Sequence, residues 1–143
     1  MWLQVQEMLF IEKGGEAQIP DELEAYNPLI PQGRELVATM MIEIEDSTRR
    51  QAMLAQLGHI EDTVKLHVND HAIAGAPEQD QDRTTPEGKT SSVHFLHFPL
   101  TDEAAVAFKT EGAKVMMEIA HENYQHMAGM PDDVRRALAT DLD

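Results

Sequence analysis

Two histidines, His94 and His97, lie in an apolar stretch, KTSSVHFLHFPL, that spans residues 89–100. Imidazole rings bind metal ions and carry protons, and two rings three residues apart on a helix can share one metal. The surrounding Val, Phe and Leu residues favour a strand, in which the two rings point to opposite faces. The spacing therefore predicts two rings packed beside a sheet, each with its own hydrogen-bond partner.

Glu118 and His121 have the Glu-x-x-His spacing of carboxylate-bridged di-iron proteins. Those sites need the motif twice, on the helices of a bundle, whereas here it occurs once and falls in a predicted edge strand. Histidines and carboxylates from different elements can still converge on one ion. The alternative hypothesis is therefore a metal site of Glu7, His94 and His121 that takes iron, zinc or manganese.

The sequence contains no recognisable catalytic constellation. It has no Gly-rich phosphate loop, no G-x-S-x-G elbow and no H-E-x-x-H motif. Ser91 and Ser92 precede His94, but a Ser and a His so close on one strand do not form a nucleophile–base pair by themselves. Glu7 and Glu12 lie about 140° apart around a helix, so one pocket does not easily hold both. These observations favour a protein that is not an enzyme.

Composition excludes several classes of function. The 143 residues include no cysteine, which excludes disulfides, thiol catalysis and thiolate-ligated zinc or iron–sulfur sites. The formal charge of −15, from 26 acidic and 11 basic residues, repels nucleic acid and anionic membranes. It suits a cationic ligand, a metal ion or a basic protein patch. With no signal peptide and no apolar run of membrane-spanning length, we expect a cytoplasmic protein.

Helices are predicted at both ends of the chain. Apolar residues at three- and four-residue steps predict a helix over residues 2–13. A second helix begins at Ile19 and must end near Asn27, because the residue before a proline disfavours helical geometry. Residues 1–33 are thus an N-terminal helical segment, and residues 131–143 form a C-terminal helix that Pro131 opens.

The sequence between these ends predicts an α+β sheet core, residues 35–121, in the ferredoxin-like split βαβ order. We expect strands at about residues 35–45, 63–74, 90–98 and 114–121, with helices after Asp46 and Thr101. The first and third strands are apolar on both faces and should be central, whereas the second and fourth alternate and should be edges. Residues 75–88 predict an exposed loop. The competing prediction is a helix over residues 114–126.

The length and the elements fit a single domain, residues 1–143. Two helices cover only one face of such a sheet, and the other face is apolar enough to need a cover. The N-terminal helices or a second copy of the chain could supply it. We therefore expect a homodimer.

Four segments together resemble a known family. They are QVQEMLFIE at residues 4–12, ELEAYNPLIPQG at residues 22–33, HIEDTVKLHV at residues 59–68 and KTSSVHFLHF at residues 89–98. They resemble the uncharacterised bacterial family known as domain of unknown function 3501, and the resemblance covers nearly the whole chain. Members of this family are often encoded beside rubrerythrin and an iron–sulfur oxidoreductase. The resemblance therefore implies a role in redox or peroxide defence, without an established activity.

The same motifs imply a set of candidate binding residues. These are Gln6, Glu7, Glu12, Tyr26, Asn27, Lys89, Ser91, Ser92 and His94, with Pro28 beside Asn27. Family members usually have more chain ahead of the first motif, and they tend to carry Arg where this chain has Phe10. A missing N-terminal element would leave the first helix or the sheet less covered and would favour dimers.

Three functions are consistent with these observations. The first is a non-catalytic accessory or binding protein, without a cofactor, that acts as a homodimer with a rubrerythrin-type redox protein. The second is the metal-dependent enzyme or metal carrier. A self-associating scaffold is the third. Convergence of Glu7, Asn27, Ser92 and His94 in one pocket would support a shared site.

Overall fold

The computed structural model describes residues 1–78 and 83–143, which divide into two compact units. Unit 1 comprises Met1–Gln32 and unit 2 comprises Gly33–Asp143. The division falls where the predicted N-terminal helical segment ends. Residues 79–82, which belong to the predicted loop, lie outside the described residues.

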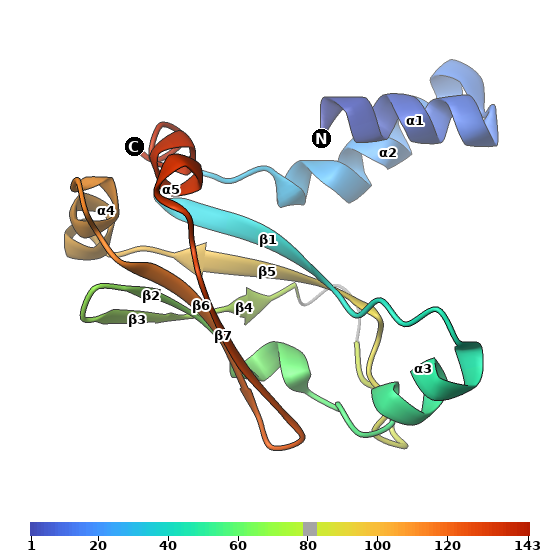
Figure 1. Cartoon of the computed structure of the whole chain (residues 1–143). Coiled ribbons are helices and arrows are strands. Elements are labelled where there is room, and N and C mark those ends of the chain that lie inside the picture. Colours follow the sequence, from blue (N-terminus) through green and yellow to red (C-terminus); the bar gives the residue numbers. More distant parts are fainter. Residues whose placement is uncertain (79–82) are drawn as a thin grey trace. The chain divides into compact units, whose positions relative to one another are not determined.

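Unit 1 is a pair of α-helices joined by a short turn (Figure 1). The first helix ends where Lys13 adopts a left-handed backbone with φ 58° and donates its N–H to the Leu9 carbonyl at 3.1 Å. Pro20 stands in the first turn of the second helix, where its missing N–H leaves no intrahelical bond unmade. The elements are α1 (Trp2–Glu12), η1 (Gly15–Gln18), α2 (Ile19–Tyr26) and η2 (Asn27–Leu29).

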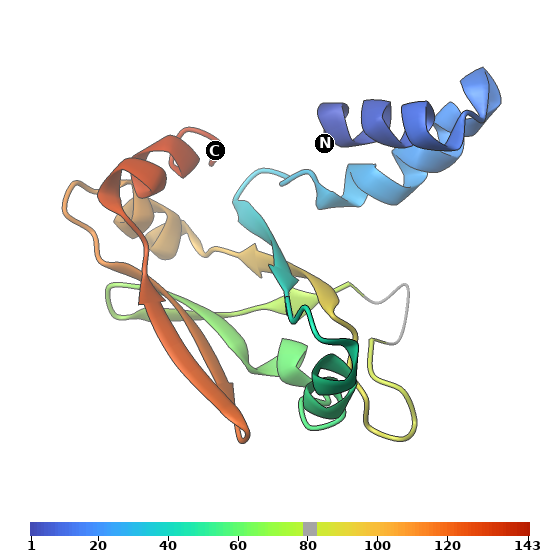
Figure 2. The same ribbon diagram turned by 45° about the vertical axis from the view of Figure 1, so that its right-hand side comes forward.

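Unit 2 combines helices with two antiparallel sheets, which confirms the predicted α+β class (Figures 1 and 2). In the described residues one sheet has the order β1-β5-β4 and the other β3-β2-β6-β7. The strands are β1 (Glu35–Met41), β2 (Val64–Val68), β3 (His71–Ala74), β4 (Ala76–Pro77), β5 (Val93–Pro99), β6 (Val115–His121) and β7 (Tyr124–Gly129). The helices are α3 (Ser47–Leu54), η3 (Ile60–Thr63), α4 (Asp102–Lys109) and α5 (Asp132–Leu138).

Side-chain caps begin two of these helices where the sequence predicted them. The Asp46 carboxylate accepts the Arg49 N–H at 2.7 Å at the start of α3. The Thr101 hydroxyl accepts the Ala104 N–H at 3.2 Å at the start of α4. Both bonds satisfy backbone donors that the helix itself leaves unpaired. Helices α4 and α5 lie together at one end of unit 2, and α3 lies at the other (Figures 1 and 2).

The two sheets and α4 share one hydrophobic cluster. Leu96 and Phe98 of β5 are almost fully buried, as are Leu66 and Val68 of β2 and Phe108 of α4. Burial of a side chain of this size stabilises the fold by roughly 1.5–3 kcal/mol. The cluster therefore fixes the two sheets relative to each other and positions the residues at their margins.

The predicted single ferredoxin-like sheet is wrong. Its first and third strands do pair, as β1 and β5, with Leu36 opposite Phe98. Its second and fourth strands, which should be opposite edges, pair with each other as β2 and β6, and Val64 lies opposite Ile119. In the described residues β1 is an edge strand rather than a central one. The sequence predicted that both faces of this strand would be covered. Met41 of β1 is nevertheless 59% exposed.

A bend at Gly75 accounts for the division into two sheets. Strand β3 pairs with β2, and after Gly75 the chain continues as β4, which pairs with β5. The Gly75 N–H donates to the Val64 carbonyl at 2.9 Å. A Cβ there would lie 3.0 Å from Phe98 Cε1, so a side chain at this position would be crowded by the buried ring. In the ferredoxin order the predicted second strand would lie beside the predicted third strand, which is β5. After the bend, β4 takes that position instead.

The segment at residues 114–121 is a strand, not the competing helix. It forms β6, which lies inside the four-stranded sheet because a further strand, β7, pairs with it. The predicted edge position of β6 is therefore wrong. The sequence did not reveal β7, since every one of its residues is exposed and no buried alternation marks it. Among the described residues, none of the helices is long and apolar enough to cross a lipid bilayer.

Candidate functional site

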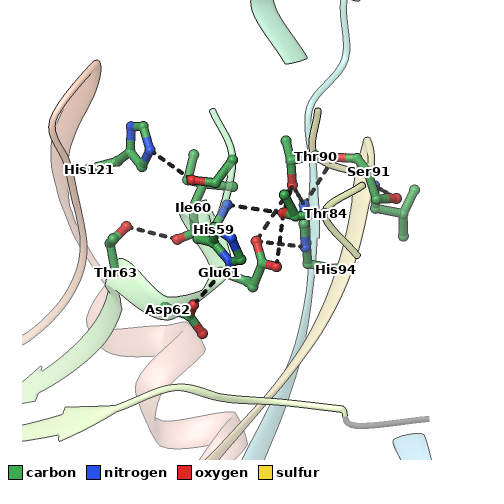
Figure 3. A network of polar contacts seen from close by, with 12 residues as sticks. His59, Ile60, Glu61, Asp62, Thr63, Thr84, Thr90, Ser91, His94 and His121 are labelled. Carbon is green, nitrogen blue, oxygen red and sulfur yellow. Dashed lines mark hydrogen bonds and ion pairs between the residues drawn. The ribbon is translucent and has the colours of Figure 1, made fainter. Parts of the chain in front are cut away.

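Four polar side chains meet in the interior of unit 2 (Figure 3). We call Glu61, Thr84, Thr90 and His94 the polar cluster. Glu61 comes from η3 and His94 from β5, while Thr84 and Thr90 form an isolated antiparallel bridge ahead of β5. The site thus joins η3 to the chain that leads into β5, and Glu61 and Thr84 are 23 positions apart in the sequence.

The contact between His94 and Glu61 is the electrostatic centre of the cluster. His94 Nδ1 lies 3.5 Å from Glu61 Oε2 and has no hydrogen-bond partner among the described residues. The other ring nitrogen, Nε2, faces the Ser91 carbonyl at 2.9 Å and so carries a hydrogen. A further proton between Nδ1 and the carboxylate makes the contact attractive, whereas a bare nitrogen against a carboxylate repels it. The two groups therefore form one buried polar contact, in which each determines the surroundings of the other.

The two threonines surround the carboxylate. Thr84 Oγ1 lies 3.5 Å from Glu61 Oε1, and Thr90 Oγ1 lies 3.5 Å from Oε2. The two hydroxyls are 3.4 Å apart, and Thr84 Oγ1 also accepts the His59 N–H at 3.0 Å. These contacts offer Glu61 hydroxyl donors in place of water, which a buried carboxylate requires. They also tie η3 to the chain that leads into β5.

Three members of the polar cluster are closed to solvent, and Thr84 is half-buried. Relative exposure is 0% for His94, 2% for Thr90 and 5% for Glu61. The predicted interpretation of His94 as a packed ring with a hydrogen-bond partner agrees with this geometry. His97 faces the other side of β5, where Nδ1 lies 3.2 Å from a Glu35 carboxylate oxygen.

The other candidates of the KTSSVHFLHF motif have different surroundings. Ser91 Oγ accepts the Val93 N–H at 3.1 Å, and the Ser91 carbonyl holds the His94 ring. Ser92 lines a surface groove, and its carbonyl accepts the Ile42 N–H at 2.8 Å. Lys89 is exposed, and its backbone N–H donates to the Thr85 hydroxyl. The structure thus brings Ser91 to His94, and it leaves the Lys89 and Ser92 side chains outside the polar cluster.

The N-terminal candidates all lie in unit 1. Gln6 and Glu7 are exposed on α1, while Tyr26 ends α2 and Asn27 begins η2. Glu12 accepts a hydrogen bond from Gln18 Nε2 at 2.7 Å, and the same amide nitrogen contacts Glu22 at 2.7 Å. Glu12 therefore helps to fix the turn between the two helices. Their convergence with Ser92 and His94 stays a prediction.

Two members of the alternative metal site, His94 and His121, have other partners in the described residues. His121 Nε2 faces the Gly58 carbonyl at 3.1 Å, and its Nδ1 accepts the Asn123 N–H at 3.1 Å. Figure 3 shows His121 and His94 on opposite sides of η3. Glu118 pairs with His67 across β2 and β6, at 2.6 Å, rather than with His121. Within residues 1–78 and 83–143, no three His, Cys, Asp or Glu side chains gather closely enough to hold a metal ion.

An apolar cleft opens near the polar cluster, between the two sheets at the end that carries α3. It has a volume of about 270 Å³. Met40 lines it and is the cross-strand neighbour of His94, and Ile60 lines it and precedes Glu61. We call this the cleft, and its lining residues are Met40, Met41, Ile42, Glu43, Ile44, Met53, Leu57, Ile60, Ile119 and Tyr124.

Hydrogen bonds at the end of the β6–β7 hairpin hold one wall of the cleft in place. Asn123 Nδ2 donates to the Gln56 carbonyl at 2.9 Å, next to the His121–Gly58 contact. Together the two side chains tie the hairpin, which carries Ile119 and Tyr124, to the connection after α3. His121 thus positions the cleft rather than lining it.

An open groove of about 700 Å³ lies beside the cleft and shares residues 41–44 with it. We call residues 41–45 the rim segment. Arg50 of α3 lines the groove and donates from its guanidinium to the Ile44 carbonyl at 2.7 Å. This bond fixes the path of the rim segment, which forms a wall of both hollows.

Sequence reasoning missed Glu61, Thr84 and Thr90 as partners of His94. Glu61 was part of the family-like HIEDTVKLHV segment, but its burial was not predicted. A glutamate beside Asp62 and Thr63 has the composition of an exposed turn. No pattern in a single sequence shows that it lies against a ring on a distant strand.

Fold and site together define a small α+β protein with two antiparallel sheets, a closed polar cluster and an open apolar cleft. The chain belongs to the family described as "Protein of unknown function (DUF3501)", whose model matches residues 1–142. It is similar to a solved structure from Burkholderia pseudomallei K96243, described as a novel protein of unknown function. The two are 43% identical with a TM-score of 0.87, over 98% of this chain and 73% of the other. No curated protein matches the chain.

Proposed function

We propose that this protein is a non-catalytic binding protein and that the cleft is its binding site. The contrast between cleft and polar cluster carries the proposal. The cleft is apolar and opens at the surface, whereas the ionisable side chains behind it are closed inside. A catalytic acid or base must come within hydrogen-bond reach of its substrate. His94 and Glu61 have no such access in this arrangement.

The lining of the cleft suits binding. Small-molecule and side-chain pockets are concave and mostly apolar, with a few polar groups that orient the occupant. Here Tyr124 supplies a hydroxyl and Glu43 a carboxylate among apolar neighbours. Met40 and Met53 contribute flexible, polarisable side chains that adapt to occupants of different shape.

The family resemblance suggests which partner to test first. It implies an accessory role beside a rubrerythrin-type redox protein, and we propose such a protein as the partner, with this chain acting as a homodimer. Binding of a purified rubrerythrin by calorimetric titration tests this part of the proposal. No heat of binding, and no redox protein recovered from a lysate with immobilised protein, would remove the redox partner and leave the cleft proposal standing.

A fluorescent probe tests the cleft directly. N-phenyl-1-naphthylamine is neutral, apolar and fluorescent in apolar surroundings, so we expect a saturable signal with one site per chain. Met53→Trp fills the cleft from α3 and should weaken probe binding by about tenfold or more. Val106→Trp adds the same side chain at a position on α4 that is 66% exposed, and it should change nothing.

Two outcomes would count against the cleft. One is a probe signal that does not saturate, and the other is equal weakening by Met53→Trp and Val106→Trp. Circular dichroism of each variant shows whether it is folded, because a variant that has lost its fold has a changed spectrum and melting temperature. In that case the milder Met53→Phe replaces Met53→Trp.

A further inference from the structure

The rim segment carries two acidic side chains beside the mouth of the cleft. Ile42 and Ile44 are half-buried, while Glu43 and Glu45 between and after them are exposed. Alternation of this kind is expected in an extended chain, where successive side chains point to opposite sides. The same short segment therefore presents apolar side chains and carboxylates in alternation along the two hollows.

These carboxylates are not held in ion pairs within the described residues. Neither Glu43 nor Glu45 forms an ion pair there, and the guanidinium of the neighbouring Arg50 is directed to the Ile44 and Glu45 carbonyls. The whole chain carries a formal charge of −15. An approaching cation is therefore attracted both by the rim segment and by the overall field.

The two hollows differ in what they can take. The cleft, at about 270 Å³, is near the lower limit of ligand pockets and matches one large apolar side chain. The groove of about 700 Å³ extends the surface along Glu43, Glu45 and Ser92. A single small molecule that fills the cleft would leave this groove empty, whereas a peptide segment can occupy both.

We propose that the occupant of the cleft is a basic segment of a partner protein, with one large apolar side chain in the cleft and flanking Lys or Arg residues against Glu43 and Glu45. This inference rests on the proposed binding function of the cleft. A second copy of the chain is a poorer occupant, because its own net charge of −15 meets the same sign at the rim segment. An acidic or uncharged segment lacks the attraction that the rim segment provides.

Labelled peptides test the inference by fluorescence anisotropy. The probe is an acetylated and amidated KKFKK peptide, and the controls are KKAKK, which lacks the apolar anchor, and EEFEE, which reverses the charge. We expect KKFKK to bind, KKAKK to bind at least about tenfold more weakly, and EEFEE not to bind. Added salt should weaken the binding of KKFKK, because exposed ion pairs are screened.

Variants of the protein separate the acidic rim from the net charge. Glu43→Gln/Glu45→Gln should weaken KKFKK binding about fivefold. Glu45→Gln alone, at a residue of the groove that does not line the cleft, should leave the binding of N-phenyl-1-naphthylamine unchanged. Glu111→Gln/Asp141→Asn removes the same charge beyond α4 and α5, at the end of unit 2 opposite α3 (Figures 1 and 2). This control should retain nearly the full peptide affinity.

The results distinguish this inference from the proposed function. If the neutral probe binds the cleft but KKFKK does not bind, or binds no better than KKAKK, the binding function stands and the basic occupant is wrong. Equal effects of the rim variant and the control variant would also overturn the inference, since only net charge would then matter. If Met53→Trp alters neither probe nor peptide binding, the cleft itself is not the site.

Discussion

His94 Nδ1 and Glu61 Oε2 lie 3.5 Å apart in the interior of unit 2, and neither residue is more than 5% exposed. A buried charge without a partner is costly, so each residue of this pair depends on the other. The pair joins η3 to β5, and the residues beside it, Ile60 and Met40, line the cleft. The polar cluster is thus the rigid support behind a binding surface.

Removal of one member of this pair should be strongly destabilising. Glu61→Ala leaves the His94 ring without its carboxylate in a closed interior, and we expect the free energy of unfolding to fall by about 3 kcal/mol. Urea denaturation followed by circular dichroism measures the change. As a control, Glu111→Gln alters an exposed glutamate and should cost less than about 0.5 kcal/mol.

A double-mutant cycle tests whether the two residues act as a pair. Glu61→Leu and His94→Leu should each be costly alone, and together should cost clearly less than the sum, because the double variant leaves no unpaired charge. Strictly additive losses would mean that the 3.5 Å contact carries no coupling energy.

Gly75 should resist substitution for a steric reason. A Cβ at this position would lie 3.0 Å from Phe98 Cε1 and 3.3 Å from the Val64 carbonyl oxygen. We expect Gly75→Ala to lower the free energy of unfolding by about 1–3 kcal/mol, as overpacking of a core does. Gly129→Ala is the matched control, since no described atom lies within 4 Å of the place that a Cβ would take there. Equal stability of both variants would refute the packing argument.

Asp132 should make stability depend on pH. Hydrogen bonds from Arg135, at 2.9 and 2.6 Å, lower the pKa of the Asp132 carboxyl below its ordinary value. A carboxyl whose pKa is lower in the folded state stabilises the fold above its unfolded pKa, about 3.9, and loses this effect as the pH falls through the folded pKa. Asp132→Asn should therefore melt at a lower temperature than the wild type at pH 7. The difference should shrink towards zero in strong acid.

The Asp132 comparison also probes a buried cation. Arg135 is 1% exposed, and its guanidinium donates to the Phe108 carbonyl at 2.7 Å, so it joins α5 to α4. A difference in melting temperature that stays constant from neutral pH to strong acid would mean that the Asp132→Asn substitution disturbs packing and that the charge of Asp132 is not involved.

Metal addition separates the binding function from its alternative. We expect no change in melting temperature when Fe²⁺, Zn²⁺ or Mn²⁺ is added to purified protein, because His121 has both ring nitrogens engaged. A rise in melting temperature that is lost in His94→Ala, His121→Ala and Glu7→Ala would instead establish the predicted metal site.

Light scattering after size-exclusion chromatography tests the predicted homodimer. A dimer should have twice the chain mass of 16.0 kDa. A single species at the monomer mass across a wide concentration range would remove the homodimer from the proposal and leave the cleft unaffected.

Local patterns in the sequence were sufficient for most elements. Asp46 and Thr101 are capping residues whose bonds reach only three residues along the chain. The alternation of residues 115–121 likewise marked a strand. Such signals need no knowledge of distant residues, so they could be interpreted correctly from the sequence.

Family membership, too, followed from the sequence, since the quoted motifs alone resembled the family whose model matches residues 1–142. Strand pairing did not follow. The apolar faces of β1 suggested a central strand, yet alternation describes which side chains share a face and not which strand lies alongside. The pairing of β2 with β6 depends on the bend at Gly75, where only the approach of Phe98 shows that a side chain would be crowded.

The sequence therefore determined the α-helices, most of the strands and the acidic, cysteine-free character of this protein, because these properties reside in neighbouring residues. Tertiary structure alone decided that Glu61 meets His94 and that Met40, Met53 and Ile119 enclose one cleft. Contacts between residues far apart in the chain depend on how whole elements pack, and burial then determines whether a side chain supports a site or faces its ligand.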